Sequence, residues 1–268
     1  MITHKWTRAD IASRRFTVLH IGRGATSATV EVMRIATRVC LLGVLVMLVS
    51  VHPALAQADR RASLTVKIAL DPSISGTVLS TGAAVIAGNP ATITETKWTD
   101  SHSKNSPLFV ADVGYSVAPA IEVLGGFEFG HAGADLVTVG TVPSGTLSAS
   151  FDAYQFWGLE GGVRFGLHQG HGAYGVVTGG FRRVSDLSAI FSAPGLTTTR
   201  AVYDGSAVGA FGFGGGFIFS SGAGFGVGLE VGVKYAGAPK PAAASPELSA
   251  VNNTGSRWSL PIGIVLRF

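Results

Sequence analysis

The chain ends with Arg257-Trp-Ser-Leu-Pro-Ile-Gly-Ile-Val-Leu-Arg-Phe268, in which large apolar residues alternate with small or polar ones. Because side chains alternate between the two faces of a β-strand, this period of two predicts a strand with one apolar and one mostly polar face. The apolar face ends on the aromatic residue Phe268, and the polar face carries Arg257 and Arg267. Whether the apolar face meets a protein core or a lipid depends on the other strands.

Seven further segments show the same alternation, which makes eight in all, an even number typical of membrane barrels built from antiparallel strands. They lie near residues 63–70, 109–117, 121–129, 151–168, 172–184, 206–219 and 225–235. The register of the fifth strand, within 172–184, is the least regular. There we expect Val177 and Phe181 to point outward and Tyr174, Thr178 and Arg182 to point inward.

The connections between these segments alternate in length. The long ones cover 71–106, 132–149, 185–203 and 236–256, and the short ones lie near 118–120, 169–172 and 220–223. Transmembrane barrels have long outer loops and short periplasmic turns. A soluble sandwich or a lipocalin-like barrel also alternates, but it does not account for this order of connections. We therefore predict an all-β fold, an eight-stranded antiparallel up-and-down transmembrane β-barrel.

The polar face of the predicted strands is rich in glycine and in charges of both signs. The interior of a barrel of about eight strands is just wide enough for side chains to fill, and buried charges are tolerated when they are paired. We therefore predict a network of ion pairs that packs the lumen. Its members are Lys67, Asp112, Glu122, Glu128, Asp152, Glu160, Arg164, Arg182, Glu230, Lys234, Arg257 and Arg267.

Residues 33–56 have the three parts of a secretory signal peptide: a basic start, an apolar run from Val39 to Val51, and a small-residue cleavage site that ends at Ala56. The predicted mature barrel is then 57–268. Residues 1–32 are interpreted as the product of a start codon placed too early, with an extended signal as the alternative. The single cysteine, Cys40, lies in this leader, which excludes a disulfide scaffold for the mature chain.

The formal charge of +4 and the pI near 9.4 also come from the leader. Residues 57–268 hold 13 basic and 14 acidic residues, so the basic surface that nucleic-acid binding needs is missing. The Gly170–Gly175 stretch matches a dinucleotide fingerprint in spacing, but a strand follows it instead of a helix. The histidines share no metal-ligand spacing. We expect no enzyme activity, no cofactor and no metal.

With eight alternating strands, short turns, four long outer connections and a terminal Phe268, residues 57–268 resemble the small eight-stranded outer-membrane barrels of Gram-negative bacteria. These are the OmpA transmembrane domain, OmpX, OmpW and the opacity-type porin-like proteins. The resemblance implies a location in the outer membrane of the cell envelope and a role for Phe268 as the insertion signal. It also implies two partners, the barrel-insertion machinery and the lipid and lipopolysaccharide of the membrane. A monomer is expected.

The sequence favours a structural or surface-interaction role carried by the four long extracellular loops, whose ligand it does not identify. The first alternative is a narrow porin-like channel for small solutes, past Glu128, Glu160, Arg164 and Glu230. The second and minor alternative is a barrel-embedded lipid hydrolase. That reading lacks a His-x-Ser pair on a lipid-facing strand, because Ala132 and Gly133 follow His131.

Overall fold

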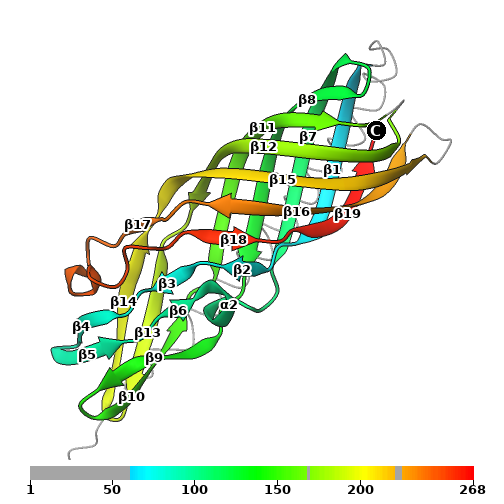
Figure 1. Ribbon diagram of the computed structural model, residues 1–268. Helices are drawn as coiled ribbons and strands as arrows, with labels where there is room; N and C mark the ends of the chain where they lie inside the picture. Colours follow the sequence, from blue (N-terminus) through cyan, green and yellow to red (C-terminus); the bar gives the residue numbers. More distant parts are fainter. Residues whose placement is uncertain (1–60, 168–169, 221–224) are drawn as a thin grey trace, which may run out of the picture. The chain divides into compact units, whose positions relative to one another are not determined.

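The structure of the protein is a computed structural model that describes residues 61–167, 170–220 and 225–268 (Figure 1). The predicted signal peptide and its cleavage site at Ala56 lie outside the described residues, as does His168. In the part of the chain that the structure describes, no helix has the length and apolar character needed to cross a membrane.

Eight antiparallel strands form a closed barrel, in the order β1-β7-β8-β11-β12-β15-β16-β19 and back to β1. The strands are β1 (Ala62–Leu70), β7 (Pro107–Ala118), β8 (Ile121–Ala132), β11 (Tyr154–Phe165), β12 (Gly172–Val184), β15 (Ser206–Ser220), β16 (Gly226–Ala236) and β19 (Ile262–Arg267). Neighbouring strands in the barrel are neighbours in sequence, apart from the inserted outer strands. The predicted all-β, eight-stranded, up-and-down architecture is confirmed.

The closing strand is interrupted once, between β18 (Arg257–Ser259) and β19. Both pieces pair with β16 in one continuous register, from Ala236 opposite Arg257 to Gly226 opposite Arg267. The break falls at Pro261, which has no N–H to give to the ladder. Its carbonyl still accepts a hydrogen bond from the Gly232 N–H at 3.0 Å. The final twelve residues therefore act as one strand.

The two faces of each barrel strand differ as the alternation predicts. On every strand a large apolar side chain is exposed on the outside: Ile68, Val113, Phe127, Leu159, Val177, Phe213, Leu229 and Ile264. In the fifth strand, β12, Val177 and Phe181 are 53% and 40% exposed, whereas Tyr174 and Arg182 are buried. The expected register of that strand is confirmed.

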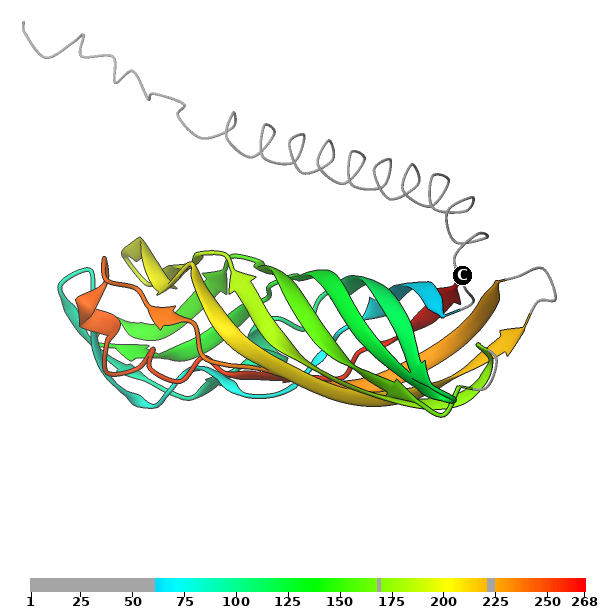
Figure 2. The same cartoon turned by 90° about the horizontal axis from the view of Figure 1, so that it is seen from above.

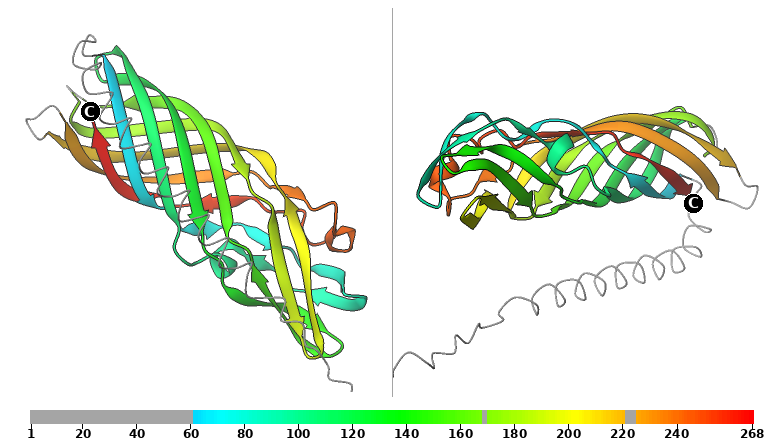
Figure 3. Two further views of the ribbon diagram at one scale, coloured as in Figure 1. Left: turned by 180° about the vertical axis from the view of Figure 1, so that it is seen from behind. Right: turned by 90° about the horizontal axis from the view of Figure 1, so that it is seen from below.

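The predicted long loops are mostly strands, which corrects the sequence interpretation. They form a second sheet of seven strands in the order β17-β14-β13-β10-β9-β5-β4. Its members are β4 (Gly82–Ile86), β5 (Asn89–Ile93), β9 (Leu136–Val142), β10 (Gly145–Phe151), β13 (Leu187–Ala193), β14 (Leu196–Asp204) and β17 (Lys240–Pro241). Figures 1 and 3 place these hairpins beyond the end of the barrel that is remote from the C-terminus. We call this sheet and the short elements beside it the extension.

The short elements of the extension are β2 (Ser73–Ser75), β3 (Thr77–Leu79), β6 (Thr96–Lys97), the one-turn helix α2 (Trp98–Ser101) and the 3-10 turn η1 (Pro246–Leu248). β2 pairs with β18, so the extension begins on the closing strand of the barrel. One contiguous apolar core includes Leu108 and Val184 from barrel strands together with Leu147, Phe191 and Trp98 from the extension. The extension and the barrel therefore share a core.

Candidate functional site

The lumen holds its charges in clusters that join strands across the barrel. Glu122 of β8 accepts a hydrogen bond from Arg164 Nη1 of β11 at 2.7 Å and two from Arg267 of β19, at 2.9 and 2.8 Å. It also accepts one from the Ser63 hydroxyl. β8 and β19 are separated by β7 and β1 in the barrel, so the pair of Glu122 and Arg267 ties together parts of the wall that are not adjacent. Arg164 also bonds Thr65 at 3.2 Å.

A second cluster is centred on Glu128, which is 2% exposed. Its carboxylate receives the Arg182 Nε–H at 2.5 Å and the Lys234 ammonium at 2.8 Å. Lys234 also binds Glu160 at 2.7 Å. The Arg182 guanidinium lies over the Phe156 ring, 4.1 Å from its centroid. Three charges from β8, β12 and β16 are thus desolvated together, with hydrogen bonds on each of them.

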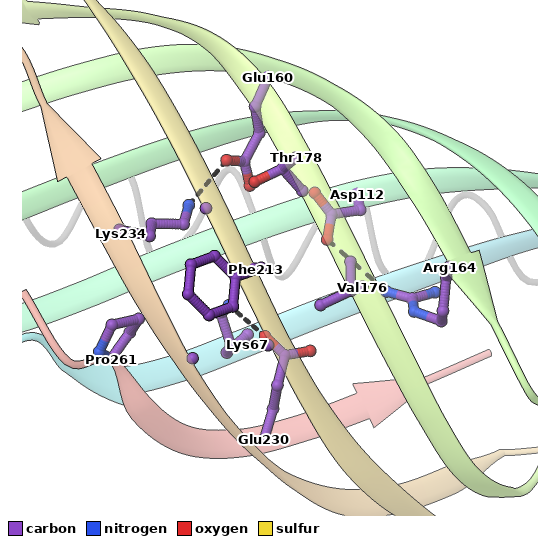
Figure 4. A pocket seen from close by; sticks show the side chains of 13 residues that line it. Lys67, Asp112, Glu160, Arg164, Val176, Thr178, Phe213, Glu230, Lys234 and Pro261 are labelled. Atoms are coloured by element: carbon purple, nitrogen blue, oxygen red, sulfur yellow. Dashed lines mark hydrogen bonds and ion pairs between the residues drawn. The ribbon is translucent and has the colours of Figure 1, made fainter.

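Between these clusters Lys67 binds Glu230 at 2.6 Å, and the Tyr174 hydroxyl donates to the same carboxylate at 2.7 Å. Asp112 has a looser partner, Arg164 Nη2 at 3.8 Å. The charged side chains Lys67, Asp112, Arg164 and Glu230, together with Glu160 and Lys234, line a cavity of about 20 Å³ (Figure 4). That volume suffices for about one water molecule. The interior at this level is a packed polar core.

One ion pair in the lumen was missed by the sequence analysis. Arg257 binds Asp71 at 2.9 Å and the Ser73 hydroxyl at 2.8 Å, and all of these groups lie at the outer end of the lumen. Asp71 had been assigned to a long loop. It follows Lys67 and Ala69 at the same parity, so continuing the alternation of β1 by one step would have placed it inward.

The structure places eleven of the twelve predicted lumen residues in ion pairs with one another or with Asp71. The prediction was wrong for Asp152, which lies between β10 and β11 with an exposed side chain. It belongs to the outer extension, where the alternation of the barrel strand no longer applies. With Asp71 in its place, the described part of the chain gives the lumen six carboxylates and six cations, whose charges sum to zero. These are Asp71, Asp112, Glu122, Glu128, Glu160 and Glu230, and Lys67, Arg164, Arg182, Lys234, Arg257 and Arg267.

The outer end of the lumen is closed by the apolar core that barrel and extension share. Tyr154 and Phe156 line the barrel end of this core, and Trp98, Phe191 and Tyr203 fill it further out, all of them buried. Trp98 packs edge-on against Tyr154, with ring centroids 5.0 Å apart. The Arg257 guanidinium lies 5.3 Å from the Tyr154 centroid. We call this layer the apolar plug, since it separates the charged lumen from the outside.

The extension also contains a serine–histidine contact. Ser101 Oγ lies 2.9 Å from His102 Nδ1, and His102 Nε2 lies 3.0 Å from the carbonyl oxygen of Asp152. The third partner is a backbone carbonyl, and both side chains are buried, so no substrate reaches this pair. Burial lowers the pKa of His102 to about 4, which fits a neutral ring inside the plug. Among the described residues, no cluster of three or more histidine, cysteine, aspartate or glutamate side chains is arranged to hold a metal ion.

The closed sheet, its paired interior and the apolar side chains on its outer surface together decide the fold type. The chain has the fold of a small eight-stranded outer-membrane β-barrel. No family model and no curated protein matches this barrel. Among the solved structures that match is Ail, the attachment invasion locus protein of Yersinia pestis, at 14% identity and a TM-score of 0.38, over 78% of this chain and 98% of Ail.

Neisserial surface protein A is a second such structure, at 11% identity and a TM-score of 0.32, over 77% of this chain and 95% of that one. At these identities and TM-scores the two likenesses carry no argument about what this barrel does.

Proposed function

We propose that this protein is an integral barrel of the bacterial outer membrane that serves as a rigid scaffold for the extension. The extension, built from the segments 71–106, 132–149, 185–203 and 236–256, is the part that contacts other molecules outside the cell. Its strands rest on a core of buried aliphatic and aromatic side chains. Binding surfaces on a fixed framework lose little conformational freedom when a partner binds.

The membrane location is supported by the exposed apolar surface. On β11 the outward residues run from Trp157 to Phe165 through Leu159 and Val163. The stretch from Trp157 to Phe165 is nine residues long. At roughly 3.3 Å per residue and a strand tilt of about 40°, it covers about 23 Å of barrel height. The oblique course of the strands is visible in Figure 2. The apolar band of outer-membrane barrels is about 25 Å tall.

Aromatic side chains gather at both ends of this band, as they do at membrane interfaces. Towards the extension, Tyr235, Trp258 and Phe211 form one cluster, with ring centroids 5.0 to 5.7 Å apart. At the other end Phe268 stacks on Phe225 at 6.3 Å. The main chain of Phe268 pairs with Leu64 in both directions. Its role as an insertion signal stays a prediction.

The observation that carries the scaffold proposal, in preference to a channel, is the filled lumen. A conducting path past Glu128, Glu160, Arg164 and Glu230 would have to cross both the paired charges and the apolar plug. Breaking a buried ion pair by removing one partner costs about 3–5 kcal/mol. The lumen charges are of both signs and sum to zero, so the lumen lacks the single-sign lining that attracts ions of one charge.

The test is to express the full chain in a Gram-negative host and purify it from the outer-membrane fraction. A folded barrel migrates differently before and after boiling on a denaturing gel, which serves as the control for folding. In planar bilayers we expect this protein to show no steady ionic conductance. Steady conductance that changes with Glu160→Gln or Arg164→Gln would overturn the scaffold proposal and favour the channel.

The orientation has its own test on intact cells with a maleimide that does not cross membranes. Ala83→Cys lies on the exposed side of β4, and Pro119→Cys lies in the turn between β7 and β8. Both variants also carry Cys40→Ser. We expect Ala83→Cys to be labelled directly and Pro119→Cys only after the outer membrane is opened. The reverse pattern would place the extension in the periplasm.

A further inference from the structure

One wall of the molecule is continuous from the barrel into the extension. β9 follows β8, β10 leads into β11, β13 follows β12, and β14 leads into β15, each across only one to three residues. Figure 3 shows these strands running on from the barrel. The outer surface of β9, β10, β13 and β14 therefore stands directly above the lipid-facing surface of β8, β11, β12 and β15. We call this combined surface the long wall.

The upper part of the long wall has two rows of uncharged side chains. In one row across the four strands Thr138, Ser148, Ser192 and Thr197 lie opposite one another. In the next row the order is Leu136, Ser150, Ile190 and Thr199. All eight side chains are exposed or partly exposed. These strands contain two charged residues, Arg200 and Asp204. Arg200 has the opposite parity and binds Glu247 at 2.9 Å. Asp204, the last residue of β14, accepts a hydrogen bond from the Ala243 N–H at 3.0 Å.

The lower part of the long wall has a row of glycines at the level of the membrane. Gly125, Gly161 and Gly179 lie opposite one another on β8, β11 and β12, at outward positions. They interrupt a surface that is otherwise covered by large side chains: Phe127, Leu159 and Phe181 on one side of the row, and Val123, Val163 and Val177 on the other. The row is a shallow depression in the apolar band.

The barrel itself does not require these three glycines. A Cβ at Gly125 would meet nothing within 4 Å, and at Gly161 and Gly179 it would have ordinary contacts of 3.6 and 4.0 Å. By contrast, a Cβ at the inward Gly162 would lie 2.2 Å from the Val177 carbonyl oxygen. The outward Gly175 is covered by the Phe165 ring. Because a glycine inside a strand weakens it, an open row of three favours a contact from outside the chain.

We propose that the long wall is the interface between two copies of this protein, standing side by side in one membrane about a two-fold axis along the membrane normal. The glycine row would let the two barrels approach closely, as small residues do for helices in membranes. The uncharged sheet faces would pack on each other above the lipid. This differs from the monomer expected from the sequence, and it rests on the membrane placement proposed above.

A second copy fits this wall because it can contact the glycine row within the membrane and because the rows that would meet are uncharged. A soluble partner cannot touch the glycine row, so an occupant of the whole wall is itself a membrane protein. A two-fold interface brings the same patch of both subunits together. The glycine row and the two rows of the sheet face carry no charge, so they meet their own copies without repulsion. The exposed charge of the barrel part, Arg183, lies at the level of Trp157, where the barrel meets the extension. Four strands about 4.8 Å apart and about seven residues long cover roughly 400 Å², half of the roughly 800 Å² per partner in stable interfaces. Both parts of the wall are therefore needed.

The test uses the full chain with Cys40→Ser, expressed in a Gram-negative host, and a short bis-maleimide added to the isolated outer membranes. Ser192→Cys places a thiol in the middle of the sheet face, and Ala83→Cys places one on β4, outside the long wall. We expect crosslinked dimers from Ser192→Cys and monomers from Ala83→Cys. Adding Gly161→Leu to Ser192→Cys should lower crosslinking about tenfold. Val231→Phe, which adds bulk on the lipid face of β16, should leave it unchanged.

Every variant is checked for the mobility shift on boiling, so that a loss of folding is not taken for a loss of association. A folded, membrane-embedded protein in which Ser192→Cys crosslinks no more than Ala83→Cys overturns the dimer. Equal effects of Gly161→Leu and Val231→Phe overturn the role of the glycine row. A protein that is missing from the membrane fraction contradicts the proposed function instead, which keeps the two failures distinct.

Discussion

Glu128 shows at the scale of one residue why the lumen charges belong together. Its carboxylate is held by Arg182 and Lys234 from two strands that are not its neighbours. Glu128→Gln keeps the volume but leaves two buried cations without their counter-charge, so we expect a loss of about 3–5 kcal/mol in unfolding free energy. Urea unfolding in lipid vesicles measures it. The matched control is Asp152→Asn, an exposed carboxylate, for which we expect a change within about 0.5 kcal/mol; equal losses would contradict the buried network.

His102 makes the stability of the extension depend on pH. Burial holds its pKa near 4 in the folded chain, whereas an unfolded histidine titrates near 6.5. Between these values the unfolded chain binds more protons, so stability falls as the pH is lowered from 6.5 towards 4, by at most about 1.4 kcal/mol per pH unit. His102→Gln keeps a donor for the Asp152 carbonyl but does not titrate. Unfolding of both proteins between pH 7 and 4 should therefore show a steeper fall for the native chain, and parallel curves would argue against this role.

At the scale of the strand, the lipid face and the water-exposed face are distinguished by the same substitution. Leu159 on β11 and Val85 on β4 are 48% and 44% exposed, so burial within the protein does not separate them. Leu159→Arg places a charge in the middle of the apolar band, and we expect it to cost about 2–4 kcal/mol. Val85→Arg faces water and should change the unfolding free energy by less than about 0.5 kcal/mol. If both variants unfold alike in vesicles, β11 does not face lipid.

The strands also show what sequence pattern does and does not reveal. A period of two over nine or more residues, as in β11 and β16, fixes which face is apolar, because only one register puts all large residues outside. The hairpins of the extension are shorter, and in a stretch of seven residues a period of two is hard to separate from chance. The turn signal Pro194-Gly195 between β13 and β14 was available, with Leu187, Ala189 and Phe191 buried at alternate positions before it.

Which charged residues pair with each other in the lumen was harder to predict than which residues point into it. Alternation says that Glu122, Arg164 and Arg267 point inward, but the pairing depends on the stagger of strands around the barrel, which connects residues far apart in sequence. Arg257 illustrates this, since its carboxylate partner Asp71 is 186 residues away. The glycine row of the long wall was equally difficult to predict from the sequence. It exists only because β8, β11 and β12 bring three separate glycines into register.

For the molecule as a whole, the shared core predicts that barrel and extension unfold together. Trp98 reports on the plug, where it is fully buried, and Trp157 reports on the lipid face of β11. Variants that retain one of these two tryptophans, with the others replaced by phenylalanine, should give the same urea midpoint by fluorescence, as a two-state transition requires. A lower midpoint for the Trp98 reporter would mean that the extension melts as a separate unit.

The closing strand also decides the net charge of the inner face of the barrel. It supplies Arg257 and Arg267, the partners of Asp71 and Glu122. A nascent sheet that ends with β16 holds all six lumen carboxylates but only four of the six cations, and its inner face carries an excess of two negative charges. The closing strand brings that excess to zero. A sheet of the other seven strands would therefore keep two more carboxylates than cations on its inner face, and pairing with the closing strand removes this imbalance.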